Sequence, residues 1–200
     1  DSDKKIQDFS KNLTIPIINL LSPSSHPCQV LSDIFTVEEV KKKSISKLDI
    51  CWIGDCNNVL NSLIASSVKF KFNLNVACPN NYRPPKFVID WVKKNKRKIN
   101  FFDDPKKAVK NADVIFSDKV VSLNDKVNKK KKFNEFKKYK VNSKLMKYAK
   151  KNAVFLHCLP RGPEVSEDVF NSKQSKVWQQ ALNRVYVQKS ILLYCFDKLR

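Results

Sequence analysis

The sequence predicts an α/β protein in which helices flank a doubly wound parallel sheet. Short apolar runs alternate with segments of helical periodicity along most of the chain, which is typical of βαβ units that share one sheet. Polar residues follow directly behind several of these runs. Because ligands bind beyond the carboxyl ends of the strands in open sheets of this class, those polar residues are candidates for a functional site.

The composition allows a sizeable core and excludes a helical membrane span. Hydrophobic residues make up 42% of the 200 residues, and no apolar run reaches the ~20 residues that cross a bilayer. The formal net charge is +20, a balance often found in nucleic-acid-binding proteins. The lysines, however, are spread along the chain without the interleaved aromatic residues of a base-stacking surface. We therefore expect a solvated basic surface, with no specific nucleic-acid partner and no membrane partner.

The cysteines and the first residues give two further indications. None of the six cysteines forms a Cys-x-x-Cys pair, so we expect neither a zinc site nor a disulfide framework. A reducing compartment is the simpler interpretation. The chain starts at Asp1 without a methionine or the apolar core of a signal peptide, and we expect a partial chain.

The N-terminal part predicts a strand, a loop and a helix. Residues 15–21 form an apolar run with a proline near its start, where a strand tolerates one. The serines at 24 and 25 are suitable N-caps, and apolar residues then recur at helical spacing over 26–43. His26 and Gln29 share one face of the first turn. The partial positive charge of a helix N-terminus favours an anion there.

The next segment predicts a strand–turn–helix unit. The apolar run 48–54 indicates a strand, and 59–68 indicates a helix. The turn between them carries Asn57 and Asn58 in place of the glycine-rich loop that binds pyrophosphate. Side-chain amides at this position suit a carboxylate or an amino-acid ligand better than a pyrophosphate.

The middle of the chain continues the alternation. Asp104-Pro105 opens one of the helices, because proline is tolerated at the first helical position. The strand that follows this helix ends at Ser117-Asp118, where Asp118 is equally suited to a turn or to a ligand. We expect strands at 74–78, 99–102 and 112–116, helices at 86–96 and 104–111, a loop at 119–132 and a mostly helical segment at 133–149.

The last predicted strand, 152–156, ends in His157, Cys158 and the breaking Pro160. A long terminal helix is expected over 177–199. Taken singly, a histidine or a cysteine at such a place is more often a buried structural residue than a functional one.

Four short motifs resemble the carbamoyltransferase family, and specifically its ornithine carbamoyltransferase branch. The resemblance runs from about residue 15 to the C-terminus, and it is carried by the order and separation of the motifs rather than by any one of them. The motifs are His26-Pro27-Cys28-Gln29, Gly54-Asp55-Cys56-Asn57-Asn58, His157-Cys158-Leu159-Pro160-Arg161 and Asn183-Arg184.

The resemblance implies a Rossmann-like ornithine-binding domain and transfer of a carbamoyl group from carbamoyl phosphate to L-ornithine. The products are citrulline and phosphate, as in arginine biosynthesis. The family uses no cofactor and no metal, so catalysis rests on positioning and electrostatics. Its members work as homotrimers in the cytoplasm, or in the mitochondrial matrix of eukaryotes.

The resemblance also assigns roles to individual residues. His26, Gln29, Cys158 and Arg184 are implied to be catalytic and to bind carbamoyl phosphate, and the Leu159 backbone is implied to contact the carbamoyl group. From the residues alone, a surface arginine is a common alternative for Arg184, so its role rests mostly on the motif.

The ornithine-binding residues implied by the resemblance lie in two segments. They are Asn58, Asp118, Ser122 and Leu123. The segment around Ser122 lacks the family's usual tryptophan and has Asn124 in place of a glycine.

The family's carbamoyl-phosphate domain, with its Ser-x-Arg-Thr-Arg loop, is missing from this sequence, so we expect the chain alone to be inactive. We interpret 1–25 as the tail of that domain, 26–45 as an interdomain helix, 46–176 as the ornithine-binding domain and 177–200 as the C-terminal helix. Two alternatives are a related carbamoyltransferase with another amine acceptor and a non-catalytic amino-acid-binding module of the same fold.

Overall fold

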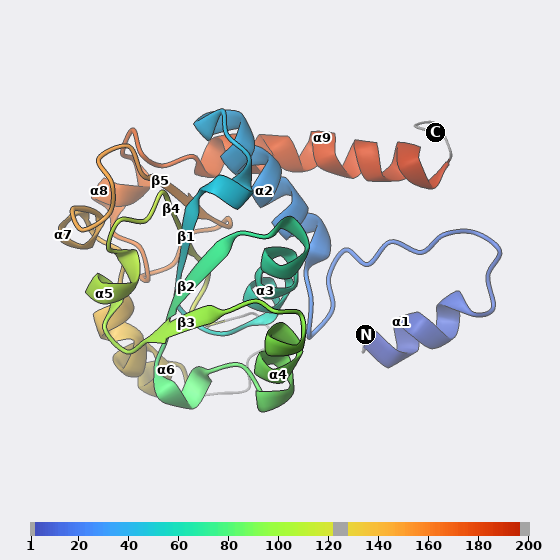
Figure 1. The fold of residues 1–200 in the computed structure, drawn as a ribbon, viewed down its shortest axis with the longest axis horizontal. Helices are drawn as coiled ribbons and strands as arrows, with labels where there is room; N and C mark the ends of the chain where they lie inside the picture. The colour runs from blue at the N-terminus through green and yellow to red at the C-terminus, as the bar shows by residue number, and fades with distance from the viewer. Residues whose placement is uncertain (1–2, 122–127, 197–200) are drawn as a thin grey trace.

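A computed structural model describes residues 3–121 and 128–196. Its centre is a parallel sheet of five strands in the order β3-β2-β1-β4-β5 (Figure 1). Every neighbouring pair of strands is parallel, so the predicted fold class is confirmed. The strands are β1 (Asp49–Ile53), β2 (Asn73–Ala77), β3 (Ile99–Phe102), β4 (Val114–Ser117) and β5 (Val154–His157).

The strand order places a switch point between β1 and β4. The chain first builds outward from β1 through β2 to β3, then crosses to the other side of β1 to add β4 and β5. Connections therefore leave β1 and β4 in opposite directions, and a crevice opens beyond the carboxyl ends of these two strands. The polar residues behind each apolar run are gathered at this end of the sheet.

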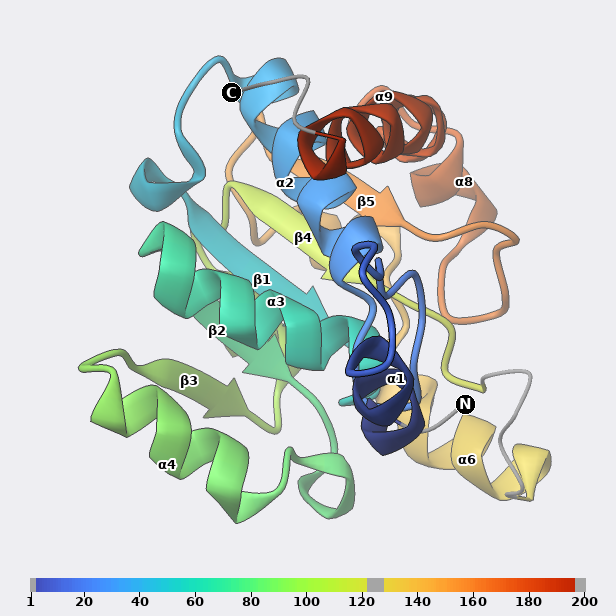
Figure 2. The same cartoon turned by 90° about the vertical axis from the view of Figure 1, so that its right-hand side faces the viewer.

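Helices cover both faces of the sheet (Figures 1 and 2). The core under α2, α3 and α4 and the core under α5 to α8 form two separate apolar clusters. The longer helices are α1 (Asp3–Ser10), α2 (Pro27–Lys41), α3 (Asn58–Phe70), α4 (Lys86–Lys94), α6 (Lys129–Phe136) and α9 (Val177–Cys195). The shorter ones are α5 (Pro105–Val109), α7 (Ser143–Met146), α8 (Glu167–Phe170) and the 3-10 turns η1 (Ile45–Lys47), η2 (Asn80–Tyr82) and η3 (Lys137–Tyr139).

The side chains of β1 point alternately to the two faces of the sheet, and they show why both faces are apolar. Ile50 and Trp52 belong to the cluster under α2, α3 and α4, whereas Cys51 and Ile53 belong to the opposite cluster. Successive side chains of a strand point to opposite faces, so a strand covered on both sides reads as a continuous apolar run. All four side chains are at most 1% exposed.

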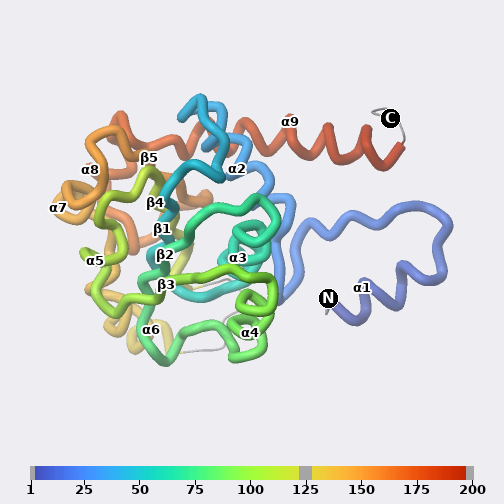
Figure 3. The backbone as a smooth tube through the Cα atoms, in the orientation of Figure 1, coloured from blue at the N-terminus to red at the C-terminus, as the bar shows by residue number. Residues whose placement is uncertain are grey.

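The terminal helix α9 packs along α2 in both views (Figures 1 and 2). The contact between them includes several polar groups: the Asn183 Nδ2 donates to the Thr36 Oγ1 at 3.0 Å, and the Ser32 Oγ donates to the Gln180 carbonyl at 3.4 Å. The C-terminal half of α9 extends beyond the sheet, and so does the N-terminal segment with α1 (Figure 3). No helix in the described part of the chain is long and apolar enough to cross a membrane.

One local prediction was wrong, a second was only partly right, and one short helix was missed. Residues 15–21 are extended but join no strand among the described residues, and Ile15 and Leu21 are 68% and 58% exposed. The helix expected at 133–149 begins earlier, at Lys129, and is interrupted where Val141 pairs with Val165 and Asn142 caps α7. The short helix α8 was not predicted, since its four residues carry too little periodicity.

Candidate active site

The backbone at the switch point is shaped by Gly54. This residue follows β1 with φ of +139°, a conformation that side chains rarely adopt. A Cβ added there would meet the Asp118 carbonyl oxygen at 3.8 Å, which is an ordinary contact. The glycine is therefore required by the backbone turn rather than by space, and the turn leads directly into the residues that face the crevice.

Asp118, Cys158 and Asn57 form one hydrogen-bonded cluster beyond β4, β5 and β1. The Cys158 thiol donates to the Asp118 Oδ1 at 2.5 Å, and the Asn57 Nδ2 donates to the Asp118 Oδ2 at 2.6 Å. Burial and the neighbouring carboxylate raise the pKa of the Cys158 thiol. Cys158 is therefore a protonated hydrogen-bond donor at neutral pH and not a thiolate nucleophile.

The two asparagines of the first turn have different partners. Asn57 is the N-cap of α3, and its Oδ1 accepts from the backbone N–H groups of Val59 and Leu60. The Asn58 Nδ2 instead donates to the Ser22 carbonyl at 2.8 Å. The residue that touches Asp118 is thus Asn57. The sequence indicated Asn57 as one of two amides in this turn, but the resemblance assigned the ornithine-binding role to Asn58. The signal that could have favoured Asn57 is the N-cap position itself, an asparagine between an apolar strand and a helix.

His26 is the N-cap residue of α2, on the other side of the crevice. Its backbone N–H donates to the Ser62 Oγ at 2.8 Å, and its buried Nδ1 has no hydrogen-bond partner among the described residues. Burial and the charge of Arg184 lower the pKa of His26, while the Leu20 backbone and the Asp118 carboxylate oppose this shift. The imidazole is therefore neutral at physiological pH, within electrostatic reach of both Arg184 and Asp118.

A chain of hydrogen bonds links α9, α2 and β5. The Arg184 Nη1 donates to the Gln29 Oε1 at 2.9 Å, and the Gln29 Nε2 donates to the Asp33 Oδ1 at 2.7 Å. The same Asp33 oxygen accepts from the Gln180 Nε2 at 2.7 Å, and the Gln180 Oε1 accepts from the His157 backbone N–H at 3.0 Å. The guanidinium is thus fixed from within the protein.

Asp33 is the buried centre of this chain. It is 3% exposed, and burial raises its pKa from 3.8 to about 7, against the two amide hydrogen bonds that it accepts. Neither Asp33 nor Gln180 was among the predicted site residues. The position of Asp33 one helical turn after Gln29 was visible in the sequence, whereas the approach of Gln180 from 147 residues away was not.

His157 and Cys158 are adjacent in sequence but have different surroundings. The His157 ring is almost fully buried, with Nδ1 2.5 Å from the Cys158 carbonyl oxygen. Its Nε2 lies 3.1 Å from the Glu164 Oε1, close enough for an ion pair but without good hydrogen-bond alignment. Although burial opposes it, the contact with His157 lowers the pKa of Glu164. His157 therefore supports the loop behind the strand, while Cys158 faces Asp118.

The structure says less about the three remaining predicted site residues. Leu159 follows Cys158 with 40% of its surface exposed. Ser122 and Leu123 lie outside the described residues. The described part of the chain contains no group of three or more His, Cys, Asp or Glu side chains that could hold a metal ion.

The arrangement combines two chemistries at one crevice. A carboxylate, an amide and a protonated thiol suit the ammonium and amine groups of an amino acid, and a guanidinium with an amide and a neutral imidazole suits an anion or a developing oxyanion. Together with the sheet order, these groups define an open α/β domain whose candidate ligand site lies at the switch point.

The chain belongs to the aspartate/ornithine carbamoyltransferase family. Residues 46–195 match the sequence model of the family's Asp/Orn binding domain. The ornithine carbamoyltransferase of Ruthia magnifica subsp. Calyptogena magnifica is 43% identical over 198 residues, which are 98% of this chain and 65% of that protein. The ornithine carbamoyltransferase of Mesorhizobium japonicum is 41% identical over 97% of this chain and 64% of its own length.

Solved structures agree with the sequence relatives. The anabolic ornithine carbamoyltransferase of Campylobacter jejuni superposes with a TM-score of 0.92 at 33% identity, over 99% of this chain and 67% of that one. The ornithine carbamoyltransferase of Pyrococcus furiosus superposes with a TM-score of 0.88 at 39% identity, over 96% of this chain and 63% of that one. The chain thus spans less than two thirds of the length of the two curated relatives above.

Proposed function

We propose that this chain is the ornithine-binding part of an ornithine carbamoyltransferase. The enzyme would transfer the carbamoyl group of carbamoyl phosphate to the side-chain amine of L-ornithine. The observation that carries the proposal is the contact of Cys158 with Asp118 across from His26 and Arg184, in a chain whose relatives bear this name.

Ornithine would bind on the Asp118 side of the crevice. The Asp118 carboxylate accepts two hydrogen bonds from the protein, and it is the group that would pair with the α-ammonium of the substrate. Asn58 would take the α-carboxylate by exchanging its bond to the Ser22 carbonyl. Ser122 and Leu123 are proposed to complete this part of the site.

Cys158 would orient the reacting amine. Because burial and the adjacent carboxylate raise its pKa, the thiol stays protonated and does not attack the carbonyl carbon. The ornithine amine would attack directly: the C–N bond forms, the C–O bond to phosphate breaks and the nitrogen releases a proton. The contribution of the protein to this step is the alignment of the two reactants.

Carbamoyl phosphate would bind on the α2 and α9 side. The neutral His26 and the Gln29 amide would donate to the carbonyl oxygen, where negative charge develops during attack. Arg184 is held by Gln29, so its guanidinium would meet the substrate in a fixed orientation. The Leu159 backbone is proposed to contact the carbamoyl group.

Assembly, compartment and pathway follow from the same proposal. We infer that the enzyme functions as a homotrimer in arginine biosynthesis, in the cytoplasm or in the mitochondrial matrix of a eukaryote. No specific nucleic-acid or membrane partner is proposed. The division of the chain at residues 25, 45 and 176 stays a prediction.

The test is a citrulline assay on the complete protein that contains this chain. Cys158→Ala and Asp118→Asn are each expected to lower kcat/KM for ornithine about a hundredfold or more, because both remove a group that positions the amine. Cys195→Ala is the matched control, since that thiol lies at the far end of α9. Wild-type kinetics in the first two variants would refute the assigned roles. A higher kcat/KM with putrescine or acetylornithine would instead favour another acceptor.

A further inference from the structure

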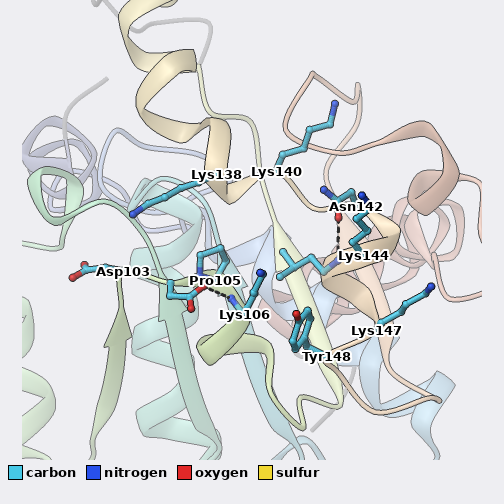
Figure 4. A pocket seen from close by; sticks show the side chains of 11 residues that line it. Asp103, Pro105, Lys106, Lys138, Lys140, Asn142, Lys144, Lys147 and Tyr148 are labelled. Carbon is cyan, nitrogen blue, oxygen red and sulfur yellow. Dashed lines mark hydrogen bonds between the residues drawn. The ribbon is translucent and has the colours of Figure 1, made fainter.

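A cavity outside the proposed active site is lined by lysines. It has a volume of about 840 Å³ and lies among the start of α5, the turn η3 and α7 (Figure 4). Ligand pockets of small molecules typically measure roughly 300–1,000 Å³. None of the residues that line the cavity belongs to the crevice at the switch point, so a ligand here would be independent of the transfer reaction.

Five ammonium groups border this lysine cavity. They come from separate elements, with Lys106 on α5, Lys138 on η3, Lys140 on the segment before α7, and Lys144 and Lys147 at α7 (Figure 4). None of the five forms an ion pair with a carboxylate among the described residues. No direct ion pair offsets their mutual repulsion, and the five ammonium groups outnumber the two carboxylates of the lining, which favours the binding of an anion.

The two carboxylates of the cavity are already engaged. Asp103 pairs with the Arg83 guanidinium at 3.0 Å, and the Asp104 Oδ1 accepts from the Lys106 backbone N–H at 3.0 Å as the N-cap of α5. The Asn142 Oδ1 accepts from the Leu145 backbone N–H, which leaves the Nδ2 of Asn142 as a further donor. The lining therefore offers an excess of donors and positive charge.

The walls that carry the lysines are held by buried groups. The Tyr139 hydroxyl donates to the Asp103 carbonyl at 3.0 Å, and this fastens η3 to the end of β3. Tyr139 and Leu145 are 2% and 6% exposed. The backbone of the cavity is thus fixed before any ligand binds, and only the lysine side chains need to be ordered.

The charge pattern indicates the class of anion. Lysine acts as a point charge toward phosphate, and at physiological ionic strength a single exposed charge pair is worth little. A bound anion must therefore engage several lysines at once, as a chain of phosphate groups can. One edge of the cavity also presents the Tyr148 ring, which is 47% exposed and has the Lys106 ammonium 5.7 Å from its centroid. A ring at this place could stack with a nucleobase.

We propose that the lysine cavity binds a small polyphosphate anion, such as an inorganic tripolyphosphate or the triphosphate of a nucleotide. The two sources share the phosphate chain, and only the nucleotide would use Tyr148. Tight binding requires the lysines to act together, so affinity should depend on these positions far more than on the overall charge of the chain.

The experiment is calorimetric titration of the 200-residue chain with tripolyphosphate and with ATP, in 150 mM salt without divalent metal. The triple variant Lys138→Gln, Lys144→Gln, Lys147→Gln is expected to bind both ligands at least about tenfold more weakly. The control Lys86→Gln, Lys93→Gln, Lys94→Gln removes the same charge from exposed positions of α4 and should stay within about twofold of the wild type. All six lysines are exposed, so both variants should keep the wild-type circular dichroism spectrum.

Three outcomes overturn the proposal. The first is that neither tripolyphosphate nor ATP binds in 150 mM salt. The second is that both triple variants lose affinity for these ligands equally. The third is that a thymidine oligonucleotide binds more tightly than ATP does and that both triple variants weaken its binding equally. The variant Tyr148→Leu distinguishes a nucleotide ligand from an inorganic polyphosphate ligand. Weaker ATP binding with unchanged tripolyphosphate binding supports a nucleotide, and no change in either supports the phosphate chain alone.

Discussion

Asp33→Asn tests whether the buried hydrogen-bond chain between α2 and α9 titrates as its surroundings dictate. Asp33 accepts hydrogen bonds from Gln29 and Gln180 with one oxygen, and burial raises its pKa from 3.8 to about 7. An acid whose pKa is higher in the folded state binds more protons there than in the unfolded chain. Its contribution to stability is fully present below pH 3.8 and is lost as the pH rises through about 7.

The size of the effect follows from the same values. About two pH units separate pH 5 from the folded-state pKa of about 7, and each unit corresponds to roughly 1.4 kcal/mol. Between pH 5 and pH 8 the wild-type chain should therefore lose about 2–3 kcal/mol through Asp33 alone. In Asp33→Asn this component is absent, because the amide does not titrate, while its oxygen can still accept from both glutamines.

The assay is urea denaturation at pH 5 and pH 8, followed by far-ultraviolet circular dichroism. The quantity that matters is the difference between the two pH values, since the new amide N–H groups can lower stability by about 1–3 kcal/mol at both. Asp90→Asn, at an exposed position of α4, controls for loss of a carboxylate. If Asp33→Asn and the wild type show the same pH dependence, Asp33 does not titrate in this range and the burial argument is wrong.

Three further predictions concern the cap of α3, the site thiol and the buried ion pair. Asn57→Ala should lower the free energy of unfolding by about 1–2 kcal/mol, because two backbone N–H groups lose their acceptor; equal urea midpoints would contradict this. Asp118→Asn should speed alkylation of Cys158 by iodoacetamide several-fold at pH 8, since burial and this carboxylate raise the thiol pKa; mass spectrometry measures the rate. Glu164→Gln should flatten the fall in melting temperature below pH 4.5. Despite burial, the contact with His157 lowers the Glu164 pKa, so the wild type loses the stability from this contact as the pH falls. An unchanged fall in melting temperature at acid pH would count against this prediction.

Much of the sheet was predictable because its strands are buried on both faces. An apolar run bounded by turn residues identifies such a strand without alternation, and the run predicted at residues 48–54 contains the buried strand β1. The same rule failed at 15–21, since an apolar run with a proline does not show whether a partner strand is available. The strand order was not predicted, because it depends on which crossovers the chain takes.

Only the site residues that lie within or close to the sequence motifs could be predicted. His26 and Gln29 are neighbours through helical spacing, and the meeting of Cys158 with Asp118 follows if their strands are adjacent and parallel, as β4 and β5 are. The contact of Gln180 with Asp33 joins residues 147 positions apart. Its existence depends on how α9 packs on α2, which no local pattern specifies.

The polar contact between α2 and α9 costs stability and fixes geometry. Apolar side chains of similar volume at Asp33 and Gln180 would avoid the burial of an ionisable group, and such replacements are often neutral or stabilising. They would also leave Gln29 without the acceptor that holds its amide nitrogen, and Arg184 without a fixed partner. Since a guanidinium contributes to transfer only when it meets the developing charge in the right orientation, we infer that this contact serves the position of Arg184 rather than the stability of the fold. The raised pKa of Asp33 agrees with this inference, because it shows that burial disfavours the charged form of the carboxyl group.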